Sequence, residues 1–153
     1  MSSKEEAKIK ALNDLVATCH DAEEGYAKAA KGVHDPALSN RLAAISGERS
    51  RFASELSAEV LKGGAKPVTS AHFGGILHAG WVDLEARIRP KPEIEILREC
   101  LRGDETTLKH YAHALDQDLS PEERSLVERH REAVEADRSG LENLIGHAKS
   151  QHA

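Results

Sequence analysis

The sequence predicts an all-α protein, an up-down-down-up four-helix bundle whose long crossover holds a short helix. Apolar residues recur with helical spacing in four long stretches, each bounded by residues that cap helices. β-branched residues are scattered, and no run with a period of two residues could form a strand. The stretches form two pairs joined by turns of a few residues, and about 28 residues separate the pairs. The short turns predict antiparallel neighbours within each pair.

The first helix is predicted over about Lys4–Val33. Ser3 and Glu6 have the spacing of a capping box, in which the serine oxygen accepts a backbone N–H and the glutamate reaches back. The second helix follows almost at once. Asp35 is its predicted N-cap, and Pro36 occupies the first helical position, where the missing N–H has no partner to lose.

Glycine and proline mark the remaining boundaries. The pair Gly63-Gly64 closes the second helix, because glycine readily takes the left-handed conformation found after helix ends. A short crossover helix is predicted over Ser70–Arg89, and the third long helix over Ile94–Leu115. The segment Ser120–Glu123 combines an N-cap, a proline and a capping box, and it starts a last helix that runs to about Ala148.

Length and composition indicate one domain, residues 1–149, with a frayed tail at 150–153. Of the 153 residues, 39% are hydrophobic and only 3% are aromatic, so aliphatic side chains must fill the core. A net charge of −5, without a basic stripe, disfavours nucleic acid as a partner. No stretch is apolar enough to span a membrane, and the charged N-terminus does not resemble a signal peptide. We therefore expect a cytoplasmic protein with no membrane partner and with Cys19 and Cys100 reduced and buried.

Charged residues interrupt the predicted core stripes near mid-bundle. The first stripe contains Glu23, and the second contains Arg49 with Glu48 beside it. The last stripe contains His130 and, two turns further on, Asp137. In the third long helix Asp104 and Glu105 straddle a stripe drawn through Ile94, Leu97, Leu101, Leu108, Ala112 and Leu115. The core is therefore predicted to contain a polar layer.

Two explanations of this layer are physically sound, because a buried charge must be paired or bound to a metal. The first is a network of ion pairs, Glu23 with Arg49 and Asp137 with His130 or Arg138, that fixes the helix register. The second is a carboxylate-rich site for iron or manganese, whose candidate ligands are Glu23, Glu48, Glu105, His130 and Asp137.

Several short motifs, in order, resemble an uncharacterised bacterial family of ferritin-like four-helix bundles, known as a domain of unknown function. They are Leu12-Asn13-Asp14-Leu15, Glu24-Gly25-Tyr26, the segment Glu48–Leu56, His78-Ala79-Gly80-Trp81, and Gly103-Asp104-Glu105 leading to Tyr111. The resemblance covers about Leu12–Ile145. It implies the ferritin-like fold, and the wider superfamily implies a di-iron site built from inward Glu residues and two Glu-x-x-His motifs.

The sequence departs from that ligand pattern where the two histidines are expected. Arg51 follows Glu48 by three residues, and Arg138 follows Glu135 by three residues. A guanidinium cannot ligate a metal, and it supplies the positive charge that a metal would supply. Arg49, Arg51 and Arg138 therefore argue against a metal centre.

We accordingly expect a non-catalytic bundle without a cofactor, with a structural, stress-associated or partner-binding role. The alternative hypothesis is a di-iron or di-manganese protein acting on oxygen or peroxide. A homo-oligomer is a third hypothesis, because bundles associate through spare apolar faces.

Overall fold

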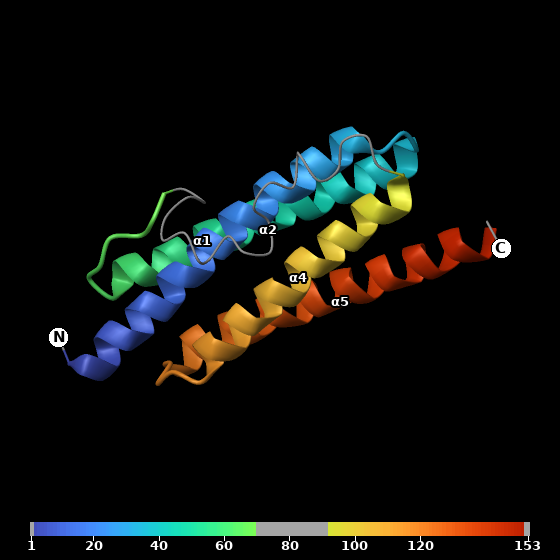
Figure 1. Cartoon of the computed structure of the whole chain (residues 1–153). Coiled ribbons are helices and arrows are strands. Elements are labelled where there is room, and N and C mark those ends of the chain that lie inside the picture. Colours follow the sequence, from blue (N-terminus) through green and yellow to red (C-terminus); the bar gives the residue numbers. More distant parts are fainter. Residues whose placement is uncertain (1, 70–91, 152–153) are drawn as a thin grey trace.

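The computed structural model describes residues 2–69 and 92–151, and these form four long helices without a strand. The helices are α1 (Ser3–Gly32), α2 (Pro36–Lys62), α4 (Glu93–Leu115) and α5 (Pro121–Gln151). Figure 1 shows them side by side as a bundle. The all-α prediction is confirmed for these residues, whereas the predicted crossover helix at Ser70–Arg89 lies outside the described residues. None of the described helices is long and apolar enough to cross a membrane.

Helix starts follow the predicted capping chemistry with one correction. The oxygen that caps α1 belongs to Ser2, which accepts a hydrogen bond from the N–H of Glu5, so the helix begins one residue before the expected start. The predicted Ser3–Glu6 capping box is therefore wrong by one position. Asp35 caps α2 as predicted, through the N–H of Leu38.

Helix ends and the start of α5 also match the sequence signals. The first residue after α2 is Gly63, and Gly64 has a φ of 81°, a conformation that an L side chain rarely adopts. The capping box before α5 is reciprocal, because Ser120 Oγ accepts from the N–H of Glu123 and Glu123 Oε1 accepts from the N–H of Ser120. The helix continues to Gln151, three residues beyond the expected end.

Contacts at both ends of the bundle fix the relative placement of the helices. At one end, Glu93 in the first turn of α4 accepts hydrogen bonds from the N–H groups of His34 and Asp35, in the turn between α1 and α2. At the other end, Lys8 near the start of α1 pairs with Glu123 in the first turn of α5 at 3.2 Å. The start of α4 therefore lies beside the end of α1, and the start of α5 beside its beginning, as Figure 1 shows.

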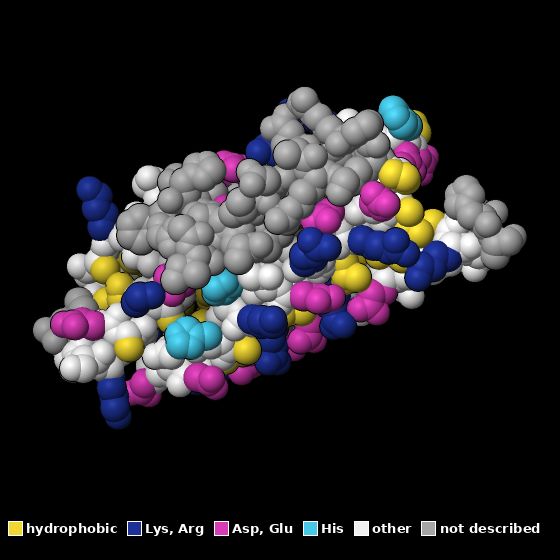
Figure 2. Space-filling view, viewed as in Figure 1, with side chains coloured by type: hydrophobic (Ala, Val, Ile, Leu, Met, Phe, Trp, Pro, Cys, Tyr) yellow, Lys and Arg dark blue, Asp and Glu magenta, His cyan; other side chains and the backbone are white. Residues whose placement is uncertain are grey.

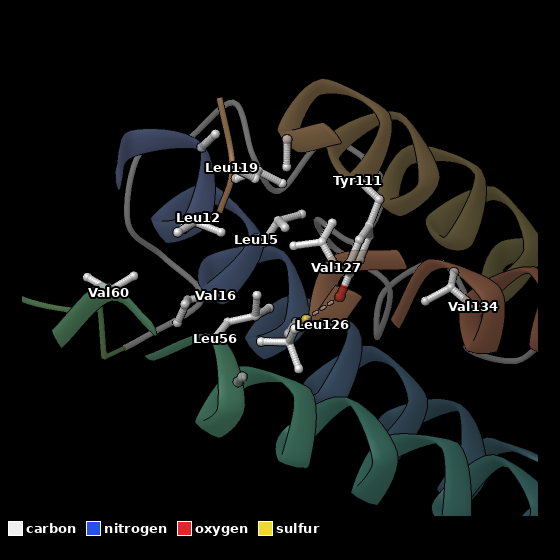
Figure 3. Close-up of a cluster of buried hydrophobic side chains, with 14 residues drawn as sticks. Leu12, Leu15, Val16, Leu56, Val60, Tyr111, Leu119, Leu126, Val127 and Val134 are labelled. Atoms are coloured by element: carbon white, nitrogen blue, oxygen red, sulfur yellow. Dashed lines mark hydrogen bonds between the residues drawn. The ribbon is translucent and has the colours of Figure 1, made fainter. Parts of the chain in front are cut away.

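The core consists of two apolar clusters, one on each side of mid-bundle. Figure 3 shows the cluster at the end where α5 begins, in which Leu15, Leu56 and Val127 have no exposed surface. The other cluster includes Leu42, Ile96 and Leu141. Most of these side chains are aliphatic, as the low aromatic content requires. Burial at about 25 cal/mol per Å² of apolar surface is the main term that holds the four helices together.

The predicted core stripe of α4 is rotated by about one residue. Ala112 is exposed, and the leucines at 101, 108 and 115 are only half-buried. The buried face instead contains Ile96, Leu97, Glu99, Cys100, Gly103, Asp104, Thr107, Tyr111 and Ala114. Because one residue turns a helix by about 100°, this rotation brings Asp104, and not Glu105, into the core.

Candidate functional site

The middle of the bundle is occupied by the guanidinium of Arg49, which has no exposed surface. Arg49 projects from α2 and makes a bidentate ion pair with Asp104 of α4, with Nη1 donating to Oδ1 at 2.7 Å and Nη2 donating to Oδ2 at 3.0 Å. Nη2 also donates to Oδ2 of Asp137 of α5 at 3.0 Å. One cation thus joins three helices.

Tyr26 adds the fourth helix, α1, to this network. Its hydroxyl donates a hydrogen bond to Oδ2 of Asp104, and its ring lies 5.2 Å from the guanidinium carbon of Arg49. That distance suits a cation–π contact, which strengthens when the partners are removed from water. We call Tyr26, Arg49, Asp104 and Asp137 the arginine layer. Each long helix contributes one member.

Burial and pairing act in opposite directions on the pKa values of Arg49 and Asp104. Burial alone would lower the pKa of Arg49, but Asp104, Tyr26 and Asp137 raise it above its ordinary value. Burial raises the pKa of Asp104, while the guanidinium and the Tyr26 hydroxyl oppose that rise. Burial also raises the pKa of Tyr26 well above 10, so its hydroxyl stays protonated and remains a donor. Loss of one member of the arginine layer would leave a buried partner without its compensating group.

Glu48 lies at the edge of the arginine layer with its side chain about a quarter exposed. Its Oε1 is 3.6 Å from Nε of Arg49, and neither atom has a hydrogen-bond partner. Asp137, whose Oδ2 lies 3.0 Å from Nη2 of Arg49, is a neighbouring carboxyl. Burial and this neighbouring carboxyl raise the pKa of Glu48 to about 7, against the opposing effect of Arg49.

A second polar group lies closer to the start of α5. His130 stacks on Phe52 with ring centroids 3.9 Å apart, and its Nε2 lies 2.9 Å from Oε1 of Glu55. Nδ1 lies 3.4 Å from the Tyr111 hydroxyl, which is 3.4 Å from Sγ of Cys19. We call Cys19, Glu55, Tyr111 and His130 the histidine layer. It too takes one member from each helix.

The Glu55 carboxylate sets the direction of the hydrogen bonds in the histidine layer. A carboxylate only accepts, so Nε2 of His130 carries the proton that Glu55 receives, and Nδ1 of the neutral ring accepts from Tyr111. Burial lowers the pKa of His130, which favours this neutral ring. Burial raises the pKa of Cys19 to about 11, so its thiol is protonated and a poor nucleophile.

The expected ion pairs are replaced by others. Glu23 does not reach Arg49; its Oε1 lies 3.6 Å from His20, at a side chain that is 38% exposed. His130 pairs with Glu55 instead of Asp137, and Arg138 pairs with Glu142 along α5. The prediction of a paired polar layer is thus right for Arg49 and Asp137 and wrong about their partners.

The candidate metal ligands are spread over different surroundings. Glu48 and Asp137 belong to one cluster, and His130 belongs to the histidine layer. Glu23 contacts His20, and Glu105 is exposed. Across residues 2–69 and 92–151, no group of three or more His, Cys, Asp or Glu side chains is arranged to hold a metal ion. The carboxylates that gather at mid-bundle surround a guanidinium. Their arrangement does not fit a di-iron centre.

Sequence reasoning assigned no role to Tyr26, Tyr111, Cys19 or Glu55 in this polar core. Cys19 stands four residues before Glu23 and Tyr26 three residues after it, on the same face of a helix, so a search for hydroxyl and thiol groups beside predicted charges could have found them. Glu55 gave no signal, because it lies on a half-exposed edge of α2.

Two hollows on the described surface are lined by residues outside the two layers. One, of about 340 Å³, lies between α1 and α2 and is lined by Ala27, Ala30, Lys31, Ser39, Ala43 and Ser46. The other, of about 580 Å³, is lined by Ser3, Lys4, Ala7, Asp116, Gln117 and Asp118. On the described part of the face in Figure 2, acidic and basic side chains alternate, and neither sign forms a continuous patch.

Comparison with known proteins identifies a family but no activity. The family described as "Domain of unknown function (DUF2383)" matches residues 7–117. No curated protein and no solved structure matches the chain.

Proposed function

The chain belongs to the DUF2383 family, and we propose that it is a non-catalytic, ferritin-like bundle with a structural or protein-binding role, in which Arg49 replaces a metal as the central cation. The observation that carries this proposal is the position of Arg49. It has no exposed surface and makes a bidentate pair with Asp104 and a further hydrogen bond to Asp137. A second cation in the same cluster would be repelled by the fixed charge of the guanidinium.

The ferritin-like, up-down-down-up arrangement is part of the same proposal. Its support is the contact of Glu93 with the α1–α2 turn and the pairing of Lys8 with Glu123 at the opposite end. These contacts match a bundle in which a long crossover returns the chain to the α1–α2 turn, so that α4 runs parallel to α2 and α5 runs parallel to α1.

Metal analysis of the full chain, purified without chelators and then incubated anaerobically with Fe²⁺ or Mn²⁺, tests the proposal. We expect negligible metal per chain and the same unfolding curve with and without a chelator. About two metal ions per chain, lost in Glu48→Ala and Asp137→Ala but retained in the exposed control Glu135→Ala, would establish the di-iron or di-manganese alternative.

Sedimentation equilibrium addresses self-association separately. A concentration-dependent mass would identify a second copy of the chain as the partner. A monomer at all concentrations would rule out the homo-oligomer hypothesis.

A further inference from the structure

Helices α1 and α2 are joined by contacts that bring their backbones close together. Ser39 Oγ donates to the carbonyl of Ala30, and Ser46 Oγ donates to the carbonyl of Glu23, each at 2.7 Å. A serine oxygen is only two bonds from its own Cα, so both hydrogen bonds require neighbouring backbones. The two contacts are seven residues apart on each helix, a distance of about 10.5 Å along the axis. The two helices therefore pack closely over at least two turns.

Helices α2 and α5 are joined instead by the ends of long side chains. Nη2 of Arg49 reaches Oδ2 of Asp137 at 3.0 Å, and the end of Arg41 occupies the space that a β-carbon at Gly140 would need. Among the described residues, the two backbones approach each other at few points. We call this contact the α2–α5 interface; its residues are Arg41, Arg49, Glu55, His130, Asp137 and Gly140.

Both polar layers reach solvent at the α2–α5 interface. At the arginine layer the side chains of Asp137 and Glu48 are 17% and 25% exposed, and at the histidine layer the side chain of Glu55 is 48% exposed. All three belong to α2 or α5. The members that α1 and α4 contribute to the two layers have no exposed surface. Each layer thus runs from a dry end at α1 and α4 to a hydrated end between α2 and α5.

We propose that α5 separates from α2 as one cooperative unit while α1 and α2 stay paired, and that this opening admits water to both polar layers. Regions joined by solvent-accessible polar contacts open at a lower free energy than regions with closely packed backbones. Partly exposed ion pairs contribute little to stability, because water hydrates the separated groups. The open form is a minor state, since α5 also buries apolar side chains that include Val127 and Leu141.

Native-state hydrogen exchange of the full chain, followed by NMR at increasing low concentrations of urea, tests the proposal. An isolated helix is only marginally stable in water, so the amides of α5 exchange once it is detached. We expect amides between Val127 and Leu141 to share one protection factor, at least tenfold below that of amides between Leu12 and Tyr26. Their urea dependence should also be weaker, because this opening exposes less surface than global unfolding.

Two variants connect the exchange to the proposed opening. Ser46→Ala removes a hydrogen bond between α1 and α2, which the opening leaves intact. It should therefore lower the protection of α1 several-fold and leave that of α5 unchanged. Asp137→Ala removes a contact that is broken both in the open form and in the unfolded chain, so it should lower the protection of α1 and α5 by the same factor.

The mild variant Ser46→Ala decides the question even if Asp137→Ala does not fold. Equal protection and equal urea dependence of α1 and α5 in the unmodified chain would overturn the proposal, and so would an equal loss in both helices in Ser46→Ala. Protection that falls gradually toward the end of α5, without a shared dependence on urea, would indicate fraying of the helix end and would also overturn it.

Discussion

Replacement of Arg49 by methionine tests whether the buried cation organises the bundle. Methionine fills a similar volume without a charge, so Arg49→Met removes two hydrogen bonds from Asp104 and one from Asp137 while limiting the cavity. Asp104 then keeps only the Tyr26 hydroxyl as a partner from the arginine layer and has no exposed surface through which water could replace the guanidinium.

The expected loss of stability follows because Asp104 would stay buried and charged after its cation is removed. Removal of one partner from a buried ion pair typically costs about 3–5 kcal/mol, because the other charge is left uncompensated. Asp137 is partly exposed and can be hydrated, so Asp104 should account for most of the loss. For a chain of this size, each kcal/mol lowers Tm by about 2–4 °C, which places the expected decrease at roughly 6–20 °C.

Chemical unfolding followed by circular dichroism at 222 nm measures this loss. Arg51→Met, an exposed position two residues away on α2, is the control and should change stability by less than about 0.5 kcal/mol. The double variant Arg49→Met with Asp104→Asn removes both charges and should recover much of the loss. If Arg49→Met fails to fold, Arg49→Lys keeps one charge without the bidentate geometry and should still destabilise measurably. A cost below about 1 kcal/mol for Arg49→Met, or no recovery in the double variant, would refute the reasoning.

Four further substitutions test individual contacts by urea unfolding. Tyr26→Phe removes the hydroxyl donor to Asp104 and should cost about 1.5–3 kcal/mol; a neutral effect would show that Arg49 alone satisfies the carboxylate. Ser120→Ala removes the cap of α5 and should cost about 1 kcal/mol, and an unchanged midpoint would contradict the capping role. Gly64→Ala places a side chain at a φ of 81° and should cost about 1 kcal/mol, although there is space for it; a stabilised variant would mean that the backbone adapts. The pKa of His130 is lowered from 6.5 on folding, so stability should fall as the pH drops below about 6.5. This pH dependence should weaken in His130→Gln; an unchanged pH dependence in that variant would show that other groups cause it.

Local signals predicted most of the helix boundaries. Asp35 with Pro36, Gly63 with Gly64, and the capping box at Ser120 depend on interactions within a few residues, so the sequence alone contains them. The one incorrect cap involved two adjacent serines with equivalent side chains. The choice of Ser2 depends on where the backbone leaves the extended conformation, which no residue type indicates.

The rotation of α4 had a different cause. Its leucines suggested a stripe by their hydrophobicity, but the face that enters the core contains small and polar residues, including Gly103, Thr107 and Tyr111. These residues are favourable there because of partners on other helices, such as Cys19 for Tyr111, and a periodicity within one helix does not contain that information. The same limit explains why Glu105 was preferred to Asp104 and why Glu23 was assigned to Arg49.

The two polar layers share a spacing that explains how one bundle can contain both. Tyr26, Asp104 and Asp137 stand seven residues from Cys19, Tyr111 and His130 on their respective helices, a separation of about 10.5 Å along each axis. Seven residues are nearly two helical turns, so a helix that directs one of these residues inward also directs the other inward. A rotation of α1, α4 or α5 would therefore break partners in both layers at once, whereas an apolar core of similar volume tolerates such shifts at a lower cost. In this arrangement the buried polar groups select one register for all four helices, and the aliphatic clusters on either side supply the stability that offsets their desolvation.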